Sequence, residues 1–336
     1  MPKMQINQDD KNTYSYSRLS AESVRYMAML HYDLDNSLTC RFYTPGMHDN
    51  YLLVVNDKKY ILRIYRNRCR SEQDIMFELD WIQYINSKTN LVAQLIPTRN
   101  ESLAFKVDCP EGPRFASLFH YADGTAPGNA IKENDAKLLG STVAQIHQYS
   151  DDFAPTYTRQ LLDANYLLDG SIQRIRPYLN HDGYAYLCSI AEYLHLSLPE
   201  IERTPGVYGL CIGDVNPTNF HINESNKITL FDLDQCGYAF RAFEIGKFFS
   251  SIRNNFNKLN IQTAFLKSYQ GIRPLSEIEQ DAIPLFEIVA VIWVMAIQVD
   301  NADLIGDKYL EQPVWDRRLN NLKQLVSEIL PEVNIK

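Results

Sequence analysis

The sequence predicts an α+β fold with two lobes, a small sheet-rich lobe up to about residue 120 and a larger, mainly helical lobe after it. Short runs of β-branched and aromatic residues, separated by turn formers, dominate the first third of the chain. After the Gly-Thr-Ala-Pro-Gly segment at 124–128, apolar residues recur mostly at helical spacings of three and four. The 336 residues are enough for two ordinary domains. We therefore predict domains at 1–120 and 121–336.

Composition narrows the class of protein and of partner. Hydrophobic residues make up 45% of the chain and charged residues 22%, which is typical of a soluble globular protein. The formal net charge of −8 opposes binding to a phosphate backbone, so we expect no nucleic-acid partner. The most apolar segment, 288–297, is much shorter than the roughly 20 residues that span a bilayer, and we interpret it as a buried core helix with no membrane partner. Six cysteines without paired short spacings indicate a reducing, cytoplasmic location and no structural metal.

In the first lobe, two pairs of strands are predicted with a helix between them. The first pair is joined by Asn56-Asp57-Lys58-Lys59, a run of turn formers that indicates a β-hairpin. The helix shows apolar residues at spacings of three and four, and Ser71 precedes it as a candidate N-cap. The predicted order is strand 51–55, strand 60–65, helix 71–85, strand 103–107 and strand 115–121.

In the second lobe, helices dominate and one β-hairpin is the exception. The hairpin consists of 220–222 and 228–231, which flank the turn-rich segment 223–227. The helices are predicted at 135–147, 164–179, 184–198 and 240–252, with two or more after residue 276.

Polar residues that flank this hairpin suggest a site for phosphate chemistry. Asn219 precedes the outgoing strand and Asp232 follows the returning one, so an antiparallel ladder brings both to the open end of the hairpin. Asp214 lies in a short loop just before Asn219, where Gly213 gives the backbone freedom and Pro217 stiffens the turn. Carboxylate and amide oxygens suit Mg²⁺, which phosphoryl transfer needs to neutralise phosphate charge.

These motifs resemble the catalytic segment of the aminoglycoside phosphotransferase and choline kinase-like family, closest to its homoserine kinase and stress-response kinase branches. The matching pattern is Gly213-Asp214-x4-Asn219, the hairpin, and then Phe231-Asp232-Leu233-Asp234 with Gly237, Tyr238, Arg241 and Glu244 after it. Leu62-Arg63-Ile64-Tyr65-Arg66, Glu78 and the segment 139–147 follow the family's order upstream, so the resemblance covers most of 50–250. It implies a two-lobed protein kinase-like fold with a nucleotide-binding antiparallel-sheet N-lobe and a catalytic, mainly helical C-lobe.

The resemblance also implies roles for individual residues. Asp214 would orient the acceptor hydroxyl and accept its proton, and Asn219 and Asp232 would hold Mg²⁺ against the phosphates of ATP. Arg63 would contact those phosphates and pair with Glu78.

Nucleotide contacts are expected on the neighbouring strand and on the hinge between the lobes. Ile61 shares a strand face with Arg63 and would add an apolar wall for adenine, while the backbone of His120 and Tyr121 would serve the adenine edge. Asp234 is a candidate substrate contact, a second metal ligand or a solvated acid.

Several residues also have an ordinary structural interpretation with no role in binding or catalysis. Arg63 has the alternative of a strand residue that extends to solvent, and Glu78 that of a solvated acid on a helix face. We interpret His147 as a structural brace and Cys211 as a small apolar residue at a strand end. Two positions differ from the family pattern, Ile212 in place of a loop-bracing His and Glu244 in place of Asp. The extra methylene of Glu244 is expected to shift its backbone contact.

The predicted function is ATP- and Mg²⁺-dependent transfer of the γ-phosphoryl group to a hydroxyl of a small molecule. Amino alcohols, aminoglycosides and homoserine-like compounds are the candidate acceptors, and the acidic chain favours cationic ones. One alternative is a Ser/Thr protein kinase of the stress-response type. The other is a catalytically impaired nucleotide-binding protein, which Ile212 suggests.

Overall fold

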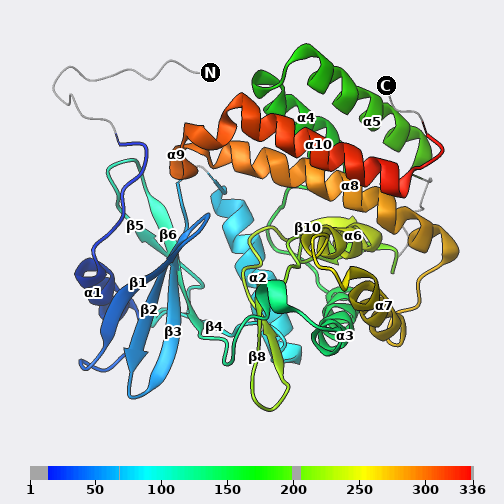
Figure 1. Cartoon of the computed structure of the whole chain (residues 1–336). Coiled ribbons are helices and arrows are strands. Elements are labelled where there is room, and N and C mark those ends of the chain that lie inside the picture. The colour runs from blue at the N-terminus through cyan, green and yellow to red at the C-terminus, as the bar shows by residue number, and fades with distance from the viewer. Residues whose placement is uncertain (1–13, 68, 199–205, 334–336) are drawn as a thin grey trace, which may run out of the picture. The chain divides into compact units, whose positions relative to one another are not determined.

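The computed structural model describes residues 14–67, 69–198 and 206–333 (Figure 1). The chain divides into two compact units, Met1–Gln83 with Ala93–Tyr121, and Tyr84–Val92 with Ala122–Lys336. The first unit carries an antiparallel sheet and the second is mainly helical. The predicted α+β class, with a sheet-rich N-terminal part and a helical remainder, is confirmed.

The N-terminal unit is built on an antiparallel sheet. Its strands are ordered β1-β2-β3-β6-β4, and β5 pairs with β6 outside this path. Helix α1 (Ala21–His31) and strand β1 were not predicted; α1 buries Val24 and Ala28 in the same apolar cluster as Leu53 and Leu62 of the sheet. The strands are β1 Thr39–Pro45, β2 Asp49–Val55, β3 Lys58–Ile64, β4 Leu95–Ile96, β5 Phe105–Val107 and β6 Arg114–His120.

The predicted first hairpin is confirmed as β2 and β3, with a tighter turn than expected. Asn56 and Asp57 adopt φ of 48° and 62°, so these two residues make the turn by themselves. Lys58 and Lys59 belong to β3 and pair with Val55 and Val54. The predicted helix is present as α2 (Glu72–Lys88), and the Ser71 hydroxyl accepts a 3.1 Å hydrogen bond from the backbone N–H of Asp74.

In the C-terminal unit, helices pack around the apolar helix α8. By length and composition, α8 is the one helix among the described residues that could cross a membrane, but 61% of its most apolar stretch is buried in the protein. It packs against α4, α6 and α10, and Trp293 is fully buried, which confirms the predicted core helix. The helices are α3 Glu133–Ser150, α4 Gly170–Ile175, α5 His181–Ser197, α6 Arg241–Ser251, α7 Lys258–Gln270, α8 Glu277–Asp300, α9 Ala302–Ile305 and α10 Gln312–Ile329.

Two short antiparallel ladders accompany these helices. The predicted hairpin is confirmed as β8 (Phe220–Ile222) and β9 (Ile228–Leu230). The expectation that this hairpin is the only sheet in the helical part was wrong, because β7 (Tyr208–Cys211) pairs with β10 (Gly237–Phe240). Each strand of that ladder has four residues, too few to show a hydrophobic period. The two ladders place the loop 212–219 between β7 and β8.

Candidate active site

A glycine fixes the entry to the loop between β7 and β8. Gly213 adopts φ of 82°, a left-handed conformation that residues with a side chain rarely take. A Cβ atom at this position would lie 2.1 Å from the backbone oxygen of Gln235. The sequence therefore needs glycine here for two separate reasons, and the turn that it makes sets the position of Asp214.

Three side chains donate hydrogen bonds to the carboxylate of Asp214. Its Oδ2 accepts from Asn216 Nδ2 at 3.0 Å and from Asn219 Nδ2 at 2.9 Å. Its Oδ1 accepts from Lys247 Nζ at 2.5 Å. The Asp214 side chain keeps 30% of its surface exposed, so a solute can reach the carboxylate.

The β8–β9 hairpin brings Asn219 and Asp232 to its open end, as the antiparallel register predicts. Phe220 pairs with Leu230, and the backbone N–H of Phe231 donates to the carbonyl of Asn219 at 2.9 Å. The Asn219 amide nitrogen donates to Asp214, so its Oδ1, which accepts a long 3.4 Å hydrogen bond from the Thr218 hydroxyl, is the side-chain atom that can bind a cation. Asp232 adopts φ of 64°, a strained conformation for a residue with a side chain and one that is often found at functional sites.

Asp234 is buried, with 4% of its surface exposed, so its interpretation as a solvated acid was wrong. Its backbone carbonyl accepts a hydrogen bond from the guanidinium of Arg159, which also donates to the Cys236 carbonyl at 2.7 Å. These contacts hold the segment that follows Asp232. A substrate contact by the Asp234 carboxylate remains a prediction.

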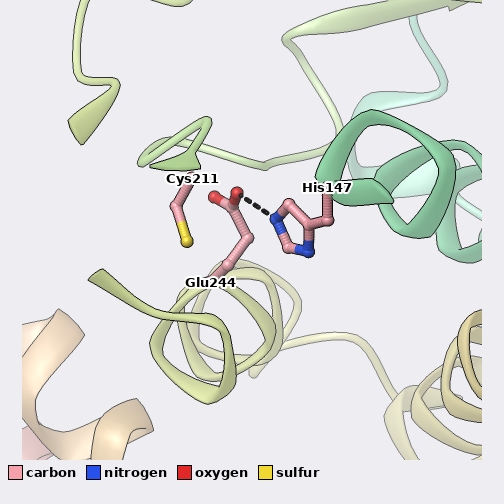
Figure 2. A group of neighbouring side chains, drawn as sticks. All are labelled: His147, Cys211 and Glu244. Carbon is pink, nitrogen blue, oxygen red and sulfur yellow. Dashed lines mark hydrogen bonds and ion pairs between the residues drawn. The ribbon is translucent and has the colours of Figure 1, made fainter. Parts of the chain in front are cut away.

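A fully buried group of side chains braces the backbone that enters the loop 212–219. Figure 2 shows Glu244 of α6 between His147 of α3 and Cys211 of β7. The Glu244 carboxylate accepts from the backbone N–H of Ile212 at 2.5 Å and from that of Gly213 at 2.8 Å. Ile212 therefore joins the brace through its backbone, and the longer side chain of Glu244 still reaches two donors.

Burial controls the protonation of this group. It raises the pKa of Glu244 to about 7, and the two backbone N–H groups oppose that rise. Burial, with Arg241 and Arg273 nearby, lowers the pKa of His147 well below its usual value. A neutral His147 can donate from Nε2 to Glu244 at 3.1 Å and accept at Nδ1 from the Tyr269 hydroxyl at 2.8 Å. With this assigned tautomer, each hydrogen bond from Tyr269 through His147 to Glu244 has a donor and an acceptor. This supports the interpretation of His147 as a brace.

The same three side chains have the residue types of a metal site, but their contacts do not favour one. Their ligand atoms lie within 4.8 Å of one another. Both oxygens of Glu244 already accept backbone hydrogen bonds, and burial raises the pKa of the Cys211 thiol well above its usual value, which disfavours the thiolate that a metal requires. We interpret the group as structural, in line with the apolar role predicted for Cys211.

In the N-terminal unit, the predicted Arg63–Glu78 pair is present. Arg63 Nη1 lies 3.1 Å from Glu78 Oε1, and the Tyr65 hydroxyl donates to Glu78 Oε2 at 3.1 Å. Arg63 is 7% exposed and Glu78 fully buried, so the interpretations as solvated side chains were wrong. The guanidinium also lies 5.5 Å from the ring centroid of Phe119. The pair holds a cation in a fixed place, and its contact with nucleotide phosphates remains a prediction.

The residues predicted to contact adenine lie on β3 and at the end of β6. Ile61 pairs with Phe119 in the sheet. The backbone N–H of His120 donates to Gln94, and that of Tyr121 to Lys59, at 2.8 and 3.1 Å. Since both donors are used inside the unit, any adenine contact by these two residues falls to their carbonyl groups or side chains.

Two of the side chains that hold Asp214 were not predicted from the sequence. Asn216 is in the same loop, whereas Lys247 is distant along the chain. Lys247 lies on α6 one turn after Glu244, and i, i+3 spacing places the two side chains on the same helix face. Glu244 then holds the loop backbone while Lys247 holds the Asp214 carboxylate. The spacing was visible, but the segment 240–252 showed an otherwise apolar helical pattern and did not reveal which loop it faces.

Comparisons with known proteins show which family this chain resembles. An uncharacterized protein of Synechocystis is 34% identical over 93% of this chain and 87% of its own length. The amicoumacin kinase of Bacillus subtilis is 26% identical over 59% of this chain and 58% of its own. A structure of an amicoumacin kinase in complex with AMP-PNP, Ca²⁺ and Ami has a TM-score of 0.76 at 21% identity, covering 90% of this chain and 93% of that one. A microcompartment-associated aminopropanol kinase gives 0.76 at 20% identity, with 92% and 96% covered.

A choline kinase from Streptococcus pneumoniae shares the fold at a lower TM-score of 0.64 and 14% identity, with 90% of this chain and 99% of that one covered. The likeness to solved structures shows the kinase-like fold that the sequence predicts. The family model that matches this chain describes a phosphotransferase enzyme family and aligns with residues 39–275, which include both the Arg63–Glu78 pair and the loop of Asp214. The chain therefore belongs to the phosphotransferase enzyme family, and its prediction as a phosphotransferase is confirmed.

Proposed function

We propose that the protein transfers the γ-phosphoryl group of ATP, with Mg²⁺, to a hydroxyl of a small molecule. The observation that carries the proposal is the arrangement of Asp214, a partly exposed carboxylate whose Oδ2 is fixed by the Asn219 amide at 2.9 Å. An acceptor hydroxyl can approach this carboxylate, while the amide oxygen of Asn219 is left for a metal. Those are the parts that phosphoryl transfer to an alcohol requires.

Asp214 acts as the acceptor of a proton and as the group that aims the attacking oxygen. The acceptor hydroxyl donates to the carboxylate, and as its oxygen forms a bond to the γ-phosphorus, its proton passes to Asp214. The bond between the γ-phosphorus and the bridging oxygen breaks, so ADP leaves with that electron pair. The products are a phosphate monoester, ADP and a proton, which Asp214 later returns to solvent.

The donor set fits a divalent cation with nucleotide phosphates. Asn219 Oδ1 and the Asp232 carboxylate supply hard oxygen atoms from the two sides of one hairpin end, which is the ligand type that Mg²⁺ prefers. The cation would neutralise the charge on the phosphate oxygens. In the N-terminal unit, Arg63, held by Glu78, is assigned to the phosphates, and Ile61, His120 and Tyr121 to adenine. The structure of an amicoumacin kinase with bound AMP-PNP supports nucleotide use.

The acceptor class follows the names of the relatives. Amicoumacin kinase and aminopropanol kinase act on small molecules, which supports an amino alcohol, aminoglycoside or homoserine-like acceptor. The alternative of a catalytically impaired protein was suggested by Ile212, whose side chain cannot brace the loop. Glu244 braces the backbone of Ile212 and Gly213 instead, so Ile212 no longer supports that alternative. Cytoplasmic location also remains a prediction; all six cysteines lie in described parts of the chain and are free thiols.

A screen of cellular metabolites tests the proposal. Purified protein is incubated with ATP, Mg²⁺ and a metabolite extract, and mass spectrometry follows the appearance of phosphate adducts. We expect adducts that need Mg²⁺ and that fall by ~10²–10⁴-fold in rate with Asp214→Ala, the range for loss of a general base. Labelled protein bands instead of labelled metabolites would favour the Ser/Thr kinase. Adducts that form equally well without Asp214 would contradict the proposed role of this residue.

A further inference from the structure

One turn of α6 holds three consecutive residues of the catalytic loop. Glu244 accepts from the backbone N–H groups of Ile212 and Gly213, and Lys247 donates to the carboxylate of Asp214. The Lys247 side chain is 5% exposed, whereas that of Asp214 is 30% exposed. Solvent and solutes therefore meet the carboxylate, and the ammonium lies behind it in the protein.

A purely structural role explains this arrangement poorly. A buried ammonium loses several kcal/mol of hydration, and an ion pair in the interior seldom stabilises a fold more than apolar side chains of the same size. An apolar residue would also match the neighbouring Phe248 and Phe249, which are buried on the same helix. The cation points instead at the carboxylate that the proposed reaction uses.

The donors on Asp214 also limit how an acceptor can bind. A carboxylate offers about four lone-pair positions. Lys247 occupies one on Oδ1, and Asn216 and Asn219 each occupy one on Oδ2. About one position is left for the acceptor hydroxyl, so its direction is set before the acceptor arrives.

Lys247 also reduces the negative charge that an acceptor meets at the Asp214 carboxylate. With Nζ 2.5 Å from Oδ1, the Asp214–Lys247 pair presents a dipole rather than a full negative charge. An acceptor whose ammonium lies on the carbon next to its reacting hydroxyl would bring a second cation within about 5–6 Å of Nζ, where like charges repel in a partly buried site.

We propose that Lys247 is a positioning and specificity residue for phosphoryl transfer. It fixes the Asp214 carboxylate for the acceptor hydroxyl and disfavours acceptors with an ammonium on the carbon adjacent to the reacting hydroxyl. This inference rests on the proposed function and narrows its acceptor class. The negative charge of the whole chain predicted cationic acceptors, whereas this local pair favours acceptors that are neutral beside the hydroxyl or carry their amino group farther away.

Matched acceptors test the inference. Transfer from ATP is measured with 1-amino-2-propanol, its neutral analogue 1,2-propanediol, and the acceptor pool of a metabolite extract, for wild type, Lys247→Met and Lys247→Arg. We expect wild type to prefer the diol over the amino alcohol in kcat/KM by at least ~10-fold. Lys247→Met is expected to lower kcat with every acceptor by ~10-fold or more and to shift the ratio toward the amino alcohol. Lys247→Arg keeps the positive charge, so it should retain most of the wild-type kcat and most of the preference for the diol.

Two controls separate a structural effect from a positioning effect. Lys137→Met replaces an exposed lysine of α3 and should leave rate and selectivity unchanged. Acetylation footprinting by mass spectrometry should show Lys247 reacting at least ~10-fold more slowly than Lys137 in wild type and faster in Asp214→Asn. The faster reaction in Asp214→Asn reports the ion pair itself, since burial alone also slows acetylation of Lys247, and neither readout needs turnover.

The outcomes distinguish the inference from the function on which it rests. Transfer that requires Asp214 but has the same kcat and selectivity in Lys247→Met overturns the role of Lys247 and leaves the proposed function standing. Lys247 that is acetylated as fast as Lys137 in wild type also overturns it. An absence of transfer to all acceptors, the extract included, overturns the proposed function and the inference together, even where footprinting shows the ion pair.

Discussion

In the loop 212–219, the position of the Asp214 side chain depends on the backbone conformation of the preceding glycine. Gly213 turns the chain with φ of 82° and places Asp214 beside its donors Asn216 and Asn219. The backbone oxygen of Gln235 occupies the space in which a Cβ of residue 213 would lie. Because that neighbour is backbone, it cannot move aside cheaply.

We expect Gly213→Ala to damage both stability and transfer. A methyl group adds strain at positive φ and a clash at 2.1 Å, and together these should lower the free energy of unfolding by about 2–4 kcal/mol. Urea denaturation measures this loss. Gly271→Ala is the matched control, since Gly271 has φ of −64° and a Cβ there would make ordinary contacts at 3.4 Å. Equal effects of the two substitutions would refute the explanation.

Sequence spacing predicted the residues of the site that share one short segment. Asp214, Asn219 and Asp232 lie within one loop and its hairpin, so an antiparallel register was enough to group Asn219 with Asp232. Lys247 reaches the same carboxylate from a helix 33 residues away. Such a contact depends on how α6 packs, which local patterns do not encode.

Helices and strands with a clear hydrophobic period were predicted from the sequence, and those with a weak period were missed. Helix α2 has a clear period and a capping serine, and its prediction was confirmed. Strands β7 and β10 have four residues each and pair across the 25 residues 212–236, so their ladder carries no local signal. Helix α1 was missed because its apolar face is narrow, with Val24 and Ala28 as its buried residues.

Helix α8 carries a carboxyl group whose ionisation should reduce stability. Burial raises the pKa of Glu287 to about 7, with Glu328 adding to the rise and the nearby Arg253 and Lys258 opposing it. The ordinary value of 4.5 applies to the unfolded chain. The native state therefore keeps a proton between pH 4.5 and 7 that the unfolded state releases, so its contribution is fully present below 4.5 and is lost as pH rises through 7.

We expect Glu287→Gln to remove this pH dependence. Between pH 4.5 and 8, wild type should lose up to about 3 kcal/mol more of its free energy of unfolding than the variant, since one pKa unit corresponds to about 1.4 kcal/mol. Denaturant titrations at several pH values measure the difference. Glu277→Gln, at an exposed position of the same helix, should keep the wild-type slope. A Glu287→Gln slope identical to wild type would argue against a buried titrating carboxyl.

For the whole molecule, the change from sheet to helix near residue 120 was readable because it changes the hydrophobic period over long stretches. The chain divides into two units, and the segment Tyr84–Val92 joins the second although it follows most of α2 along the chain. That exception reflects long-range contacts, such as the hydrogen bond from Leu230 to the Leu91 carbonyl. Hydrophobic periodicity predicts the type of secondary structure in each unit. It does not predict which unit a segment such as Tyr84–Val92 packs with.

Ligand-induced stabilisation tests the proposed roles of Arg63 and Asn219 in binding nucleotide and Mg²⁺. A ligand at about 100 times its Kd stabilises the native state by about 2.7 kcal/mol, and we expect a rise of several degrees in Tm with AMP-PNP and Mg²⁺ that EDTA reduces. Arg63→Met in the N-terminal unit and Asn219→Ala in the C-terminal unit should each shrink the rise. The exposed Lys106→Met should keep it, because its side chain pairs with Glu72 at the surface. A rise that survives both Arg63→Met and Asn219→Ala would show that the nucleotide binds elsewhere, and a rise unaffected by EDTA would remove the metal from the proposal.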